Sequence, residues 1–323
     1  MKKSTKTALI ATGIAAASAT VLVTLHQLTA RGFMKFALDR KAPKILEKNQ
    51  TAFMGSKEIF NYIDKLNEGA EALKRKNCET VELLSYDGIN LVGHWYPCKN
   101  AKRVIIAVHG WRANWARDFG VIADFLHEND CSVLIIEQRA QGESGGEYMG
   151  FGLLERYDCY EWAKWADLKT EGKLPIYLMG VSMGATTVLM TTGFKLPKSV
   201  KGVIADCGFT SPHAIWKHVA ENNLKIPFGL YSAISNEIFK KRIRIGANEY
   251  TCAKALENCT IPVLFVHGTD DSFVPVTMTF ENYKACKSEK RMFIVPDAEH
   301  GMSYIVDKKG YEEKLLEFFN DFG

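Results

Sequence analysis

A serine between glycines is the clearest chemical feature of this sequence. Gly180-Val181-Ser182-Met183-Gly184 follows the apolar run 176–179 and precedes a segment of helical composition. Where a strand turns sharply into a helix, such a serine is held in a strained conformation with its hydroxyl exposed, and the glycines avoid clashes that side chains would cause. We therefore interpret Ser182 as a nucleophile, with a purely structural turn as the alternative.

A serine hydroxyl is a weak nucleophile at neutral pH and needs a base, which a third group must orient. Of the eight histidines, His300 lies in the loop after the last apolar run, from which it can reach over the edge of a sheet to Ser182. The acid is expected in the loop after the preceding run, which contains Asp270 and Asp271. Asp206, after an earlier run, is a third candidate.

Acyl transfer also needs donors for the negative charge that develops on the carbonyl oxygen, and these are usually backbone N–H groups. We assign one to Met183, at the start of the predicted helix. The second is expected from the loop His109-Gly110-Trp111-Arg112, which follows the apolar run 104–108, and we assign it to Trp111. The Trp111 indole has two interpretations: it walls an acyl pocket, or it only packs beneath a lid.

The elements that position these residues are short apolar runs that alternate with amphipathic segments. This rhythm predicts an α/β fold, with a mainly parallel eight-stranded sheet and helices on both of its faces. An antiparallel hairpin is expected at its start, near Asp87-Gly88, and a helical lid at about 207–255, above the carboxyl edge of the sheet. The eight predicted strands contain residues 81–84, 89–95, 104–108, 133–136, 176–179, 203–205, 263–266 and 292–295.

The N-terminus has a different composition. No Asp, Glu, Lys or Arg occurs between Lys6 and Arg31, and this apolar interval is long enough to span a bilayer. We predict a single-pass transmembrane helix within residues 1–31, which would place the protein at a membrane. A cleaved signal peptide, which would make the protein secreted, is one alternative, because Ala17-Ser18-Ala19 resembles a cleavage site, and a buried helix is the other. Basic residues on both sides of the interval leave its orientation open.

Composition narrows the remaining possibilities. The chain has 323 residues, of which 80–323 are expected to form one catalytic domain and 32–79 a linker with surface helices. Basic and acidic residues, 41 and 37, are interspersed and give a net charge of +4, which does not predict nucleic-acid binding. The eight scattered cysteines have no metal-site spacing, so no metal is predicted, and they favour a reducing environment.

The order of serine, acid and histidine, together with the loop 109–111, resembles the α/β-hydrolase family over about residues 80–323. Residues 137–146 are similar to the family's Asp-x-Arg-Gly-x-Gly-x-Ser segment, with Glu and Ala at two of its positions. The resemblance is greatest to bacterial esterases of the cinnamoyl-esterase, Bem46-like and prolyl-oligopeptidase-like branches. In such hydrolases the acid segment commonly reads His-Gly-x-x-Asp-x-x-Val-Pro, which implies that Asp271 is the acid, with His267-Gly268 and Val274-Pro275 at the two ends of the segment.

This resemblance implies a serine hydrolase that cleaves carboxylic esters through an acyl-enzyme on Ser182, without a metal or an organic cofactor. Amidase, aminopeptidase, thioesterase and lysophospholipase activities are alternatives, because the same triad serves them all. A binding protein on a hydrolase scaffold is the alternative outside enzymes, although every catalytic position is filled. The expected partners are a small-molecule ester or acyl substrate and a membrane, and no obligate protein partner is evident.

Overall fold

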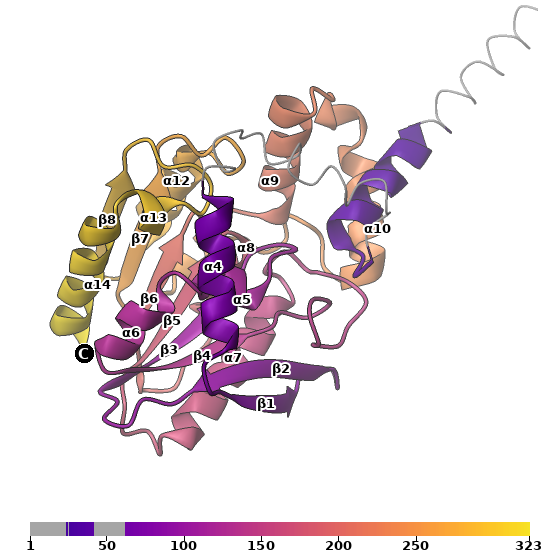
Figure 1. The fold of residues 1–323 in the computed structure, drawn as a ribbon. Helices are drawn as coiled ribbons and strands as arrows, with labels where there is room; N and C mark the ends of the chain where they lie inside the picture. The colour runs from indigo at the N-terminus through magenta and orange to yellow at the C-terminus, as the bar shows by residue number, and fades with distance from the viewer. Residues whose placement is uncertain (1–23, 25, 42–61) are drawn as a thin grey trace, which may run out of the picture.

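The computed structural model describes residues 24, 26–41 and 62–323, which contain one eight-stranded sheet (Figure 1). The strand order is β1-β2-β4-β3-β5-β6-β7-β8. Strands β1 and β2 form the predicted antiparallel hairpin, β2 is also antiparallel to β4, and the other pairs are parallel. All eight predicted strands are confirmed, with the bounds Glu79–Leu84, Asn90–Tyr96, Arg103–Val108, Cys131–Ile136, Ile176–Val181, Val200–Asp206, Val263–Gly268 and Lys290–Val295 for β1 to β8.

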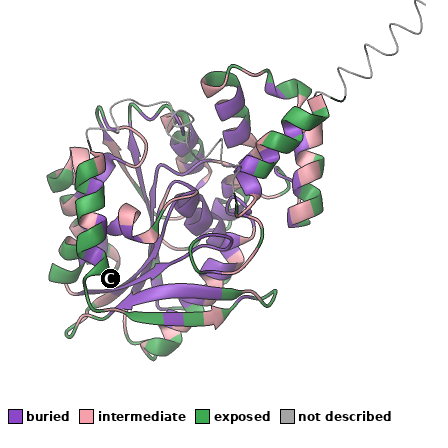
Figure 2. Ribbon diagram, turned by 45° about the vertical axis from the view of Figure 1, so that its right-hand side comes forward, coloured by how far each residue is buried: buried purple, intermediate pink, exposed green. Residues whose placement is uncertain are grey.

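The central strands are mainly apolar because both faces of the sheet are covered. In β3, Val104 and Ile106 point into one hydrophobic cluster, whereas Ile105 and Ala107 point into a second cluster on the opposite face. All four side chains are fully buried. The strands in the middle of the sheet have the colour of buried residues in Figure 2. Burial on both sides therefore explains why these strands read as continuous apolar runs rather than as alternating ones.

Helices cover each face of the sheet. The first cluster is completed by α7 (Glu155–Lys169), α8 (Met183–Thr191), α11 (Cys252–Leu256) and α12 (Val276–Ala285). The second is completed by α4 (Ile63–Lys74), α5 (Trp115–Phe119), α6 (Ala123–Glu128), α13 (Ser303–Val306) and α14 (Lys308–Phe322).

The segment predicted as a lid contains several short helices. Between β6 and α11 the chain forms α9 (Pro212–His218), a π-helical turn η2 (Val219–Asn223), a 3-10 turn η3 (Phe228–Leu230) and α10 (Ser232–Ile243). Helices α9 and α10 lie beyond one end of the strands, apart from the helices that cover the faces of the sheet (Figure 1). The Trp216 ring on α9 packs against Phe239 of α10, with ring centroids 4.9 Å apart.

A helix of residues 26–38 lies beside α10 (Figure 1). It joins residues that the sequence assigns partly to the anchor and partly to the linker. Met34 and Leu38 are fully buried, so this helix belongs to the main core and is more than a surface helix. Most of the predicted anchor, residues 1–23 and 25, lies outside the described residues. Within the part of the chain that the structure describes, no helix has the length and apolar character needed to cross a membrane.

Candidate active site

Ser182 occupies the turn between β5 and α8. Its backbone dihedrals are φ 57° and ψ −118°, a conformation that is strained for a residue with a side chain. Two glycines make this turn possible. A Cβ at Gly184 would lie 1.9 Å from the carbonyl oxygen of Val108, and one at Gly180 would lie 2.3 Å from the backbone of Gly184. The glycines of the motif are therefore required because the turn packs directly on its own backbone and on β3.

The structure brings the predicted nucleophile, base and acid together. His300 lies in the loop after β8, and its Nε2 is 2.8 Å from the Oγ of Ser182. Its Nδ1 is 2.7 Å from Oδ2 of Asp271, which lies in the loop after β7. An imidazole held in this way can accept the serine proton at Nε2 while Nδ1–H stays bonded to the carboxylate.

The surroundings of Asp271 keep its carboxylate ionised. Burial would raise the pKa of Asp271, but attraction to His300 and hydrogen bonds from His267 and His300 outweigh burial and lower it to about 2. The other carboxylate oxygen, Oδ1, accepts the backbone N–H groups of Phe273 and Val274 at 3.0 and 2.7 Å. One oxygen of Asp271 thus holds His300, and the other stabilises the turn that contains Asp271 itself.

The other two acid candidates lie in different environments. Asp270 is exposed, and its carboxylate accepts a hydrogen bond from the Thr269 hydroxyl at 2.8 Å. Asp206 is buried and accepts the Ser303 hydroxyl at 3.0 Å, while its backbone carbonyl accepts the N–H of Ser182 at 2.9 Å. Neither carboxylate replaces Asp271 as the hydrogen-bond partner of His300.

The ionisation of His300 reflects a balance between burial and nearby carboxylates. Burial lowers its pKa, but the charge and hydrogen bond of Asp271 raise it, with smaller contributions from Asp206 and Asp118. The net effect is a pKa above the usual value of a histidine. A base with a raised pKa binds the serine proton more firmly, which favours formation of the alkoxide equivalent.

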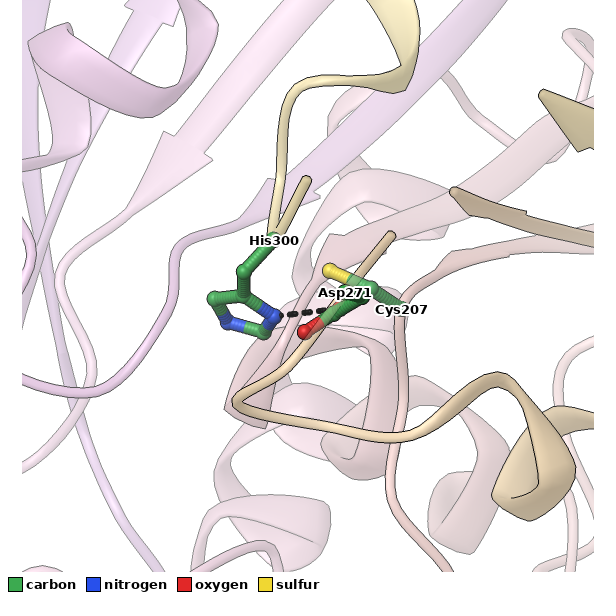
Figure 3. Close-up of side chains that lie close together, drawn as sticks. All are labelled: Cys207, Asp271 and His300. Atoms are coloured by element: carbon green, nitrogen blue, oxygen red, sulfur yellow. Dashed lines mark hydrogen bonds and ion pairs between the residues drawn. The ribbon is translucent and has the colours of Figure 1, made fainter. Parts of the chain in front are cut away.

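Cys207, which follows β6, lies beside the His300–Asp271 pair (Figure 3). By residue type the three could bind a metal, since their donor atoms lie within 4.8 Å of one another. However, burial raises the pKa of the Cys207 thiol well above its usual value, so the thiolate that a metal requires is disfavoured. The hydrogen bond between His300 Nδ1 and Asp271 Oδ2 also occupies two of the atoms that would have to bind a metal. We therefore interpret the cluster as the histidine and acid of the triad with a protonated Cys207 beside them.

The loop predicted to supply the second oxyanion donor lies directly against the serine. A Cβ at Gly110 would be only 3.3 Å from the Cβ of Ser182. The N–H of Gly110 donates to the half-buried carboxylate of Asp118 at 2.8 Å, which leaves the next N–H, that of Trp111, as the candidate donor. Met183 begins α8, where its N–H has no carbonyl one helical turn earlier to bond. The roles of Trp111 and Met183 remain predictions.

Three polar residues that support this geometry were not predicted from the sequence. His267 is fully buried and its Nε2 is 3.1 Å from Oδ2 of Asp271, so a second histidine contacts the acid. His109 accepts the N–H of Gln138 at Nε2 and, through Nδ1, contacts the Gly110 carbonyl at 2.8 Å. With Asp118, His109 holds the backbone of the oxyanion loop. The sequence marked His267 as one end of the segment that contains Asp271, but it did not predict that the two side chains are in contact.

Two cavities meet at Ser182 and share Trp111 and Phe273. The larger, of about 170 Å³, also contains His300 and polar groups of Arg112 and Asp118. The smaller, of about 40 Å³, is almost entirely apolar and is walled by aromatic side chains, including Trp216. The Trp111 side chain thus lines a cavity at the serine as well as packing against neighbouring rings, so it fits both interpretations made from the sequence.

Comparison with known proteins agrees with this geometry. The model of a protein family described as alpha/beta hydrolase fold matches residues 103–251, which include Trp111 and Ser182 but end before Asp271. Uncharacterized protein YqkD of Bacillus subtilis (strain 168) is 27% identical over 234 residues, which are 72% of this chain and 76% of that protein. Uncharacterized protein YfhR of Escherichia coli (strain K12) is 25% identical over 252 residues, 75% of this chain and 80% of that protein.

Solved structures are similar to this one over about three quarters of the chain. An esterase from Pyrococcus furiosus, Pf2001, superposes with a TM-score of 0.63 at 23% identity and covers 76% of this chain and 91% of its own. None of these similarities identifies one of the narrower esterase branches. The sheet, the turn at Ser182 and the family model that matches residues 103–251 agree that the chain has an α/β-hydrolase fold.

Proposed function

We propose that the protein is a serine hydrolase that cleaves carboxylic esters. The observation that carries this proposal is the continuous chain of contacts from Ser182 Oγ to His300 Nε2, 2.8 Å, and from His300 Nδ1 to Asp271, 2.7 Å. The strained turn at Ser182 supports it, because such strain is typical of functional sites. The similarity of the fold to that of an esterase from Pyrococcus furiosus supports ester substrates.

In the first half of the reaction, Ser182 Oγ attacks the ester carbonyl carbon while its proton moves to Nε2 of His300. The carbonyl oxygen becomes an oxyanion and accepts hydrogen bonds from the N–H groups of Trp111 and Met183. As the tetrahedral intermediate collapses, the bond to the alcohol oxygen breaks, and His300 gives its proton to that oxygen. The alcohol leaves and the acyl group remains on Ser182.

The second half repeats these steps with water as the nucleophile. His300 takes a proton from water, whose oxygen attacks the acyl carbon, and the same two N–H groups hold the oxyanion. Collapse breaks the bond to Ser182 Oγ, which recovers its proton from His300, and the carboxylic acid is released. Asp271 stays ionised throughout, because its role is to orient and stabilise the imidazolium.

A fluorophosphonate probe tests the nucleophile. We expect it to label wild-type protein once, at Ser182, and not to label Ser182→Ala. Ser272→Ala is the matched control, because Ser272 is an exposed serine beside Asp271 and should leave labelling intact. Ser182→Ala should also lose turnover of p-nitrophenyl esters by roughly a millionfold if the triad acts as a unit. Persistent labelling of Ser182→Ala would contradict the proposal.

We also propose that residues 1–31 hold the enzyme at a membrane, because their uncharged interval is long enough to span a bilayer. Residues 26–31 of this segment are part of the helix of residues 26–38, which packs into the core and would keep the catalytic domain close to the bilayer. Retention of the full-length protein in membranes after carbonate extraction is the expected result. Release into the supernatant would contradict the anchor.

A further inference from the structure

The helix of residues 26–38 is bound directly to the loop that faces Ser182. The indole Nε1–H of Trp111 donates to the carbonyl of Ala37 at 2.8 Å. The Phe36 ring meets the Trp111 ring edge to face, with centroids 5.2 Å apart. The helix therefore packs on the same residue whose backbone N–H we assign to the oxyanion.

Charged side chains hold the end of this helix in place. The Arg112 guanidinium donates to the carbonyl of Phe36 at 2.7 and 3.1 Å, where a cation is favourable because the carbonyls at a helix C-terminus lack partners. Arg242 of α10 forms an ion pair with Asp39 at 2.7 Å and donates to the carbonyl of Met34 at 3.3 Å. The helix is thus fixed between the oxyanion loop and the lid helices.

Side chains of the helix of residues 26–38 complete the apolar cavity beside Ser182. Phe33, Phe36 and Ala37 line this cavity together with aromatic residues from later in the chain, such as Phe151 and Trp216. A second small cavity, of about 20 Å³, lies farther along the same helix, next to Thr29 and Ala30 and to residues of the lid segment. Phe33 lines both cavities, and its ring is the side chain of this helix that they share.

We propose that the apolar cavity receives the acyl group of the substrate, that Phe33 is its end wall, and that the protein therefore prefers esters of short, apolar acyl chains. This inference rests on the proposed ester hydrolysis. An apolar chain gains by leaving water for a cavity lined by carbon, whereas the larger cavity, with Arg112 and Asp118, suits the more polar alcohol portion. Residues that precede the catalytic domain in the sequence would then determine its substrate specificity.

Esters of p-nitrophenol from acetate to dodecanoate test this assignment. Wild-type protein should prefer the short members of the series. Phe33→Ala should join the two cavities and move the optimum to longer chains. Because each methylene that becomes buried contributes about fourfold to kcat/KM, two more buried methylenes should raise kcat/KM for a medium-chain ester more than about tenfold relative to butyrate.

Phe280→Ala is the matched control, since Phe280 lies on α12, is 44% exposed and lines neither cavity. Its chain-length profile should match that of wild type. Phe33→Leu, a smaller change, should shift the optimum in the same direction and replaces Phe33→Ala if that variant does not fold. If esters are hydrolysed but both Phe33 variants keep the wild-type profile, the inference is wrong and the proposed function stands.

Fatty-acid binding separates the two proposals. The proteins to compare are Ser182→Ala, in which no turnover is expected, and the same variant with Phe33→Ala added. Their affinities for fatty acids can be measured by tryptophan fluorescence, and the double variant should bind longer chains more tightly than Ser182→Ala does. That result without ester hydrolysis by wild type would contradict the proposed function while supporting the acyl cavity. An unchanged order of fatty-acid affinities would count against Phe33 as the end wall.

Discussion

At the scale of single residues, the site depends on which of two adjacent aspartates orients His300. The Asp271 carboxylate is buried and lies 2.7 Å from Nδ1, whereas Asp270 is exposed and is bonded to Thr269. Asp271→Asn should favour the wrong tautomer of His300 and lower kcat by roughly ten-thousandfold, by analogy with a serine protease. Asp270→Asn is the matched control and should retain near-normal turnover, with circular dichroism used to check that both variants are folded. The reverse pattern would overturn the assignment.

The raised pKa of His300 predicts the acid side of the pH profile. His300 acts as a base only when it is neutral, so kcat/KM should fall about tenfold per pH unit below a pKa that lies above the usual histidine value. Removing the charge of Asp271 removes the main contribution that raises this pKa, so in Asp271→Asn the residual activity should decline only at lower pH. Measuring kcat/KM against pH for both proteins checks this. An acid limb at the same pH in both would contradict the role of Asp271 in setting the pKa.

At the scale of elements, the contact between the turn at Ser182 and β3 leaves no space for a side chain at Gly184. Because a Cβ on Gly184 would lie 1.9 Å from the carbonyl oxygen of Val108, Gly184→Ala must move α8 or the strand. We expect a loss of about 3 kcal/mol in the free energy of unfolding, together with loss of ester hydrolysis. The control is Gly229→Ala, whose added Cβ would meet no atom within 4 Å. Urea denaturation measures the stability of both variants. Equal denaturation midpoints for Gly184→Ala and Gly229→Ala would show that the packing tolerates the added methyl group.

At the scale of the whole molecule, the helix of residues 26–38 joins α10 to the loop that contains Trp111. Met34, Phe36 and Leu38 are at least 96% buried, and burying three such side chains contributes about 6 kcal/mol to folding. A protein without residues 1–41 should therefore be destabilised and should expose apolar surface around Trp111. Its hydrolysis of p-nitrophenyl butyrate should fall by about a hundredfold, because the oxyanion loop loses its support.

A shorter deletion, of residues 1–25, is the matched comparison for this truncation. It removes most of the predicted anchor but leaves the helix of residues 26–38 in place. This protein should remain in the supernatant after carbonate extraction and hydrolyse p-nitrophenyl butyrate like the full chain. Size-exclusion chromatography and initial rates compare the two truncations. Equal activity of both would contradict a role for the helix at the active site.

The sequence by itself was sufficient to predict the eight strands, the hairpin, and the serine, histidine and aspartate that the structure brings into contact. Strands buried on both faces must be continuously apolar, and the turn at Ser182 must have glycines where the backbone approaches itself, so both leave local signals. Asp271 was preferred over Asp270 because a motif marked its register. These features could be predicted because each depends on residues that are close together in the chain.

Only the tertiary structure revealed the strand order, the contact of His267 with Asp271, and the hydrogen bond from the Gly110 N–H to the Asp118 carboxylate. It also decided that Phe33 and Phe36, in a segment interpreted as a linker, line a cavity at Ser182. Ser182 lies about 150 residues further along the chain than Phe33. Such contacts leave no periodic or local pattern, because the packing of distant segments alone brings them together.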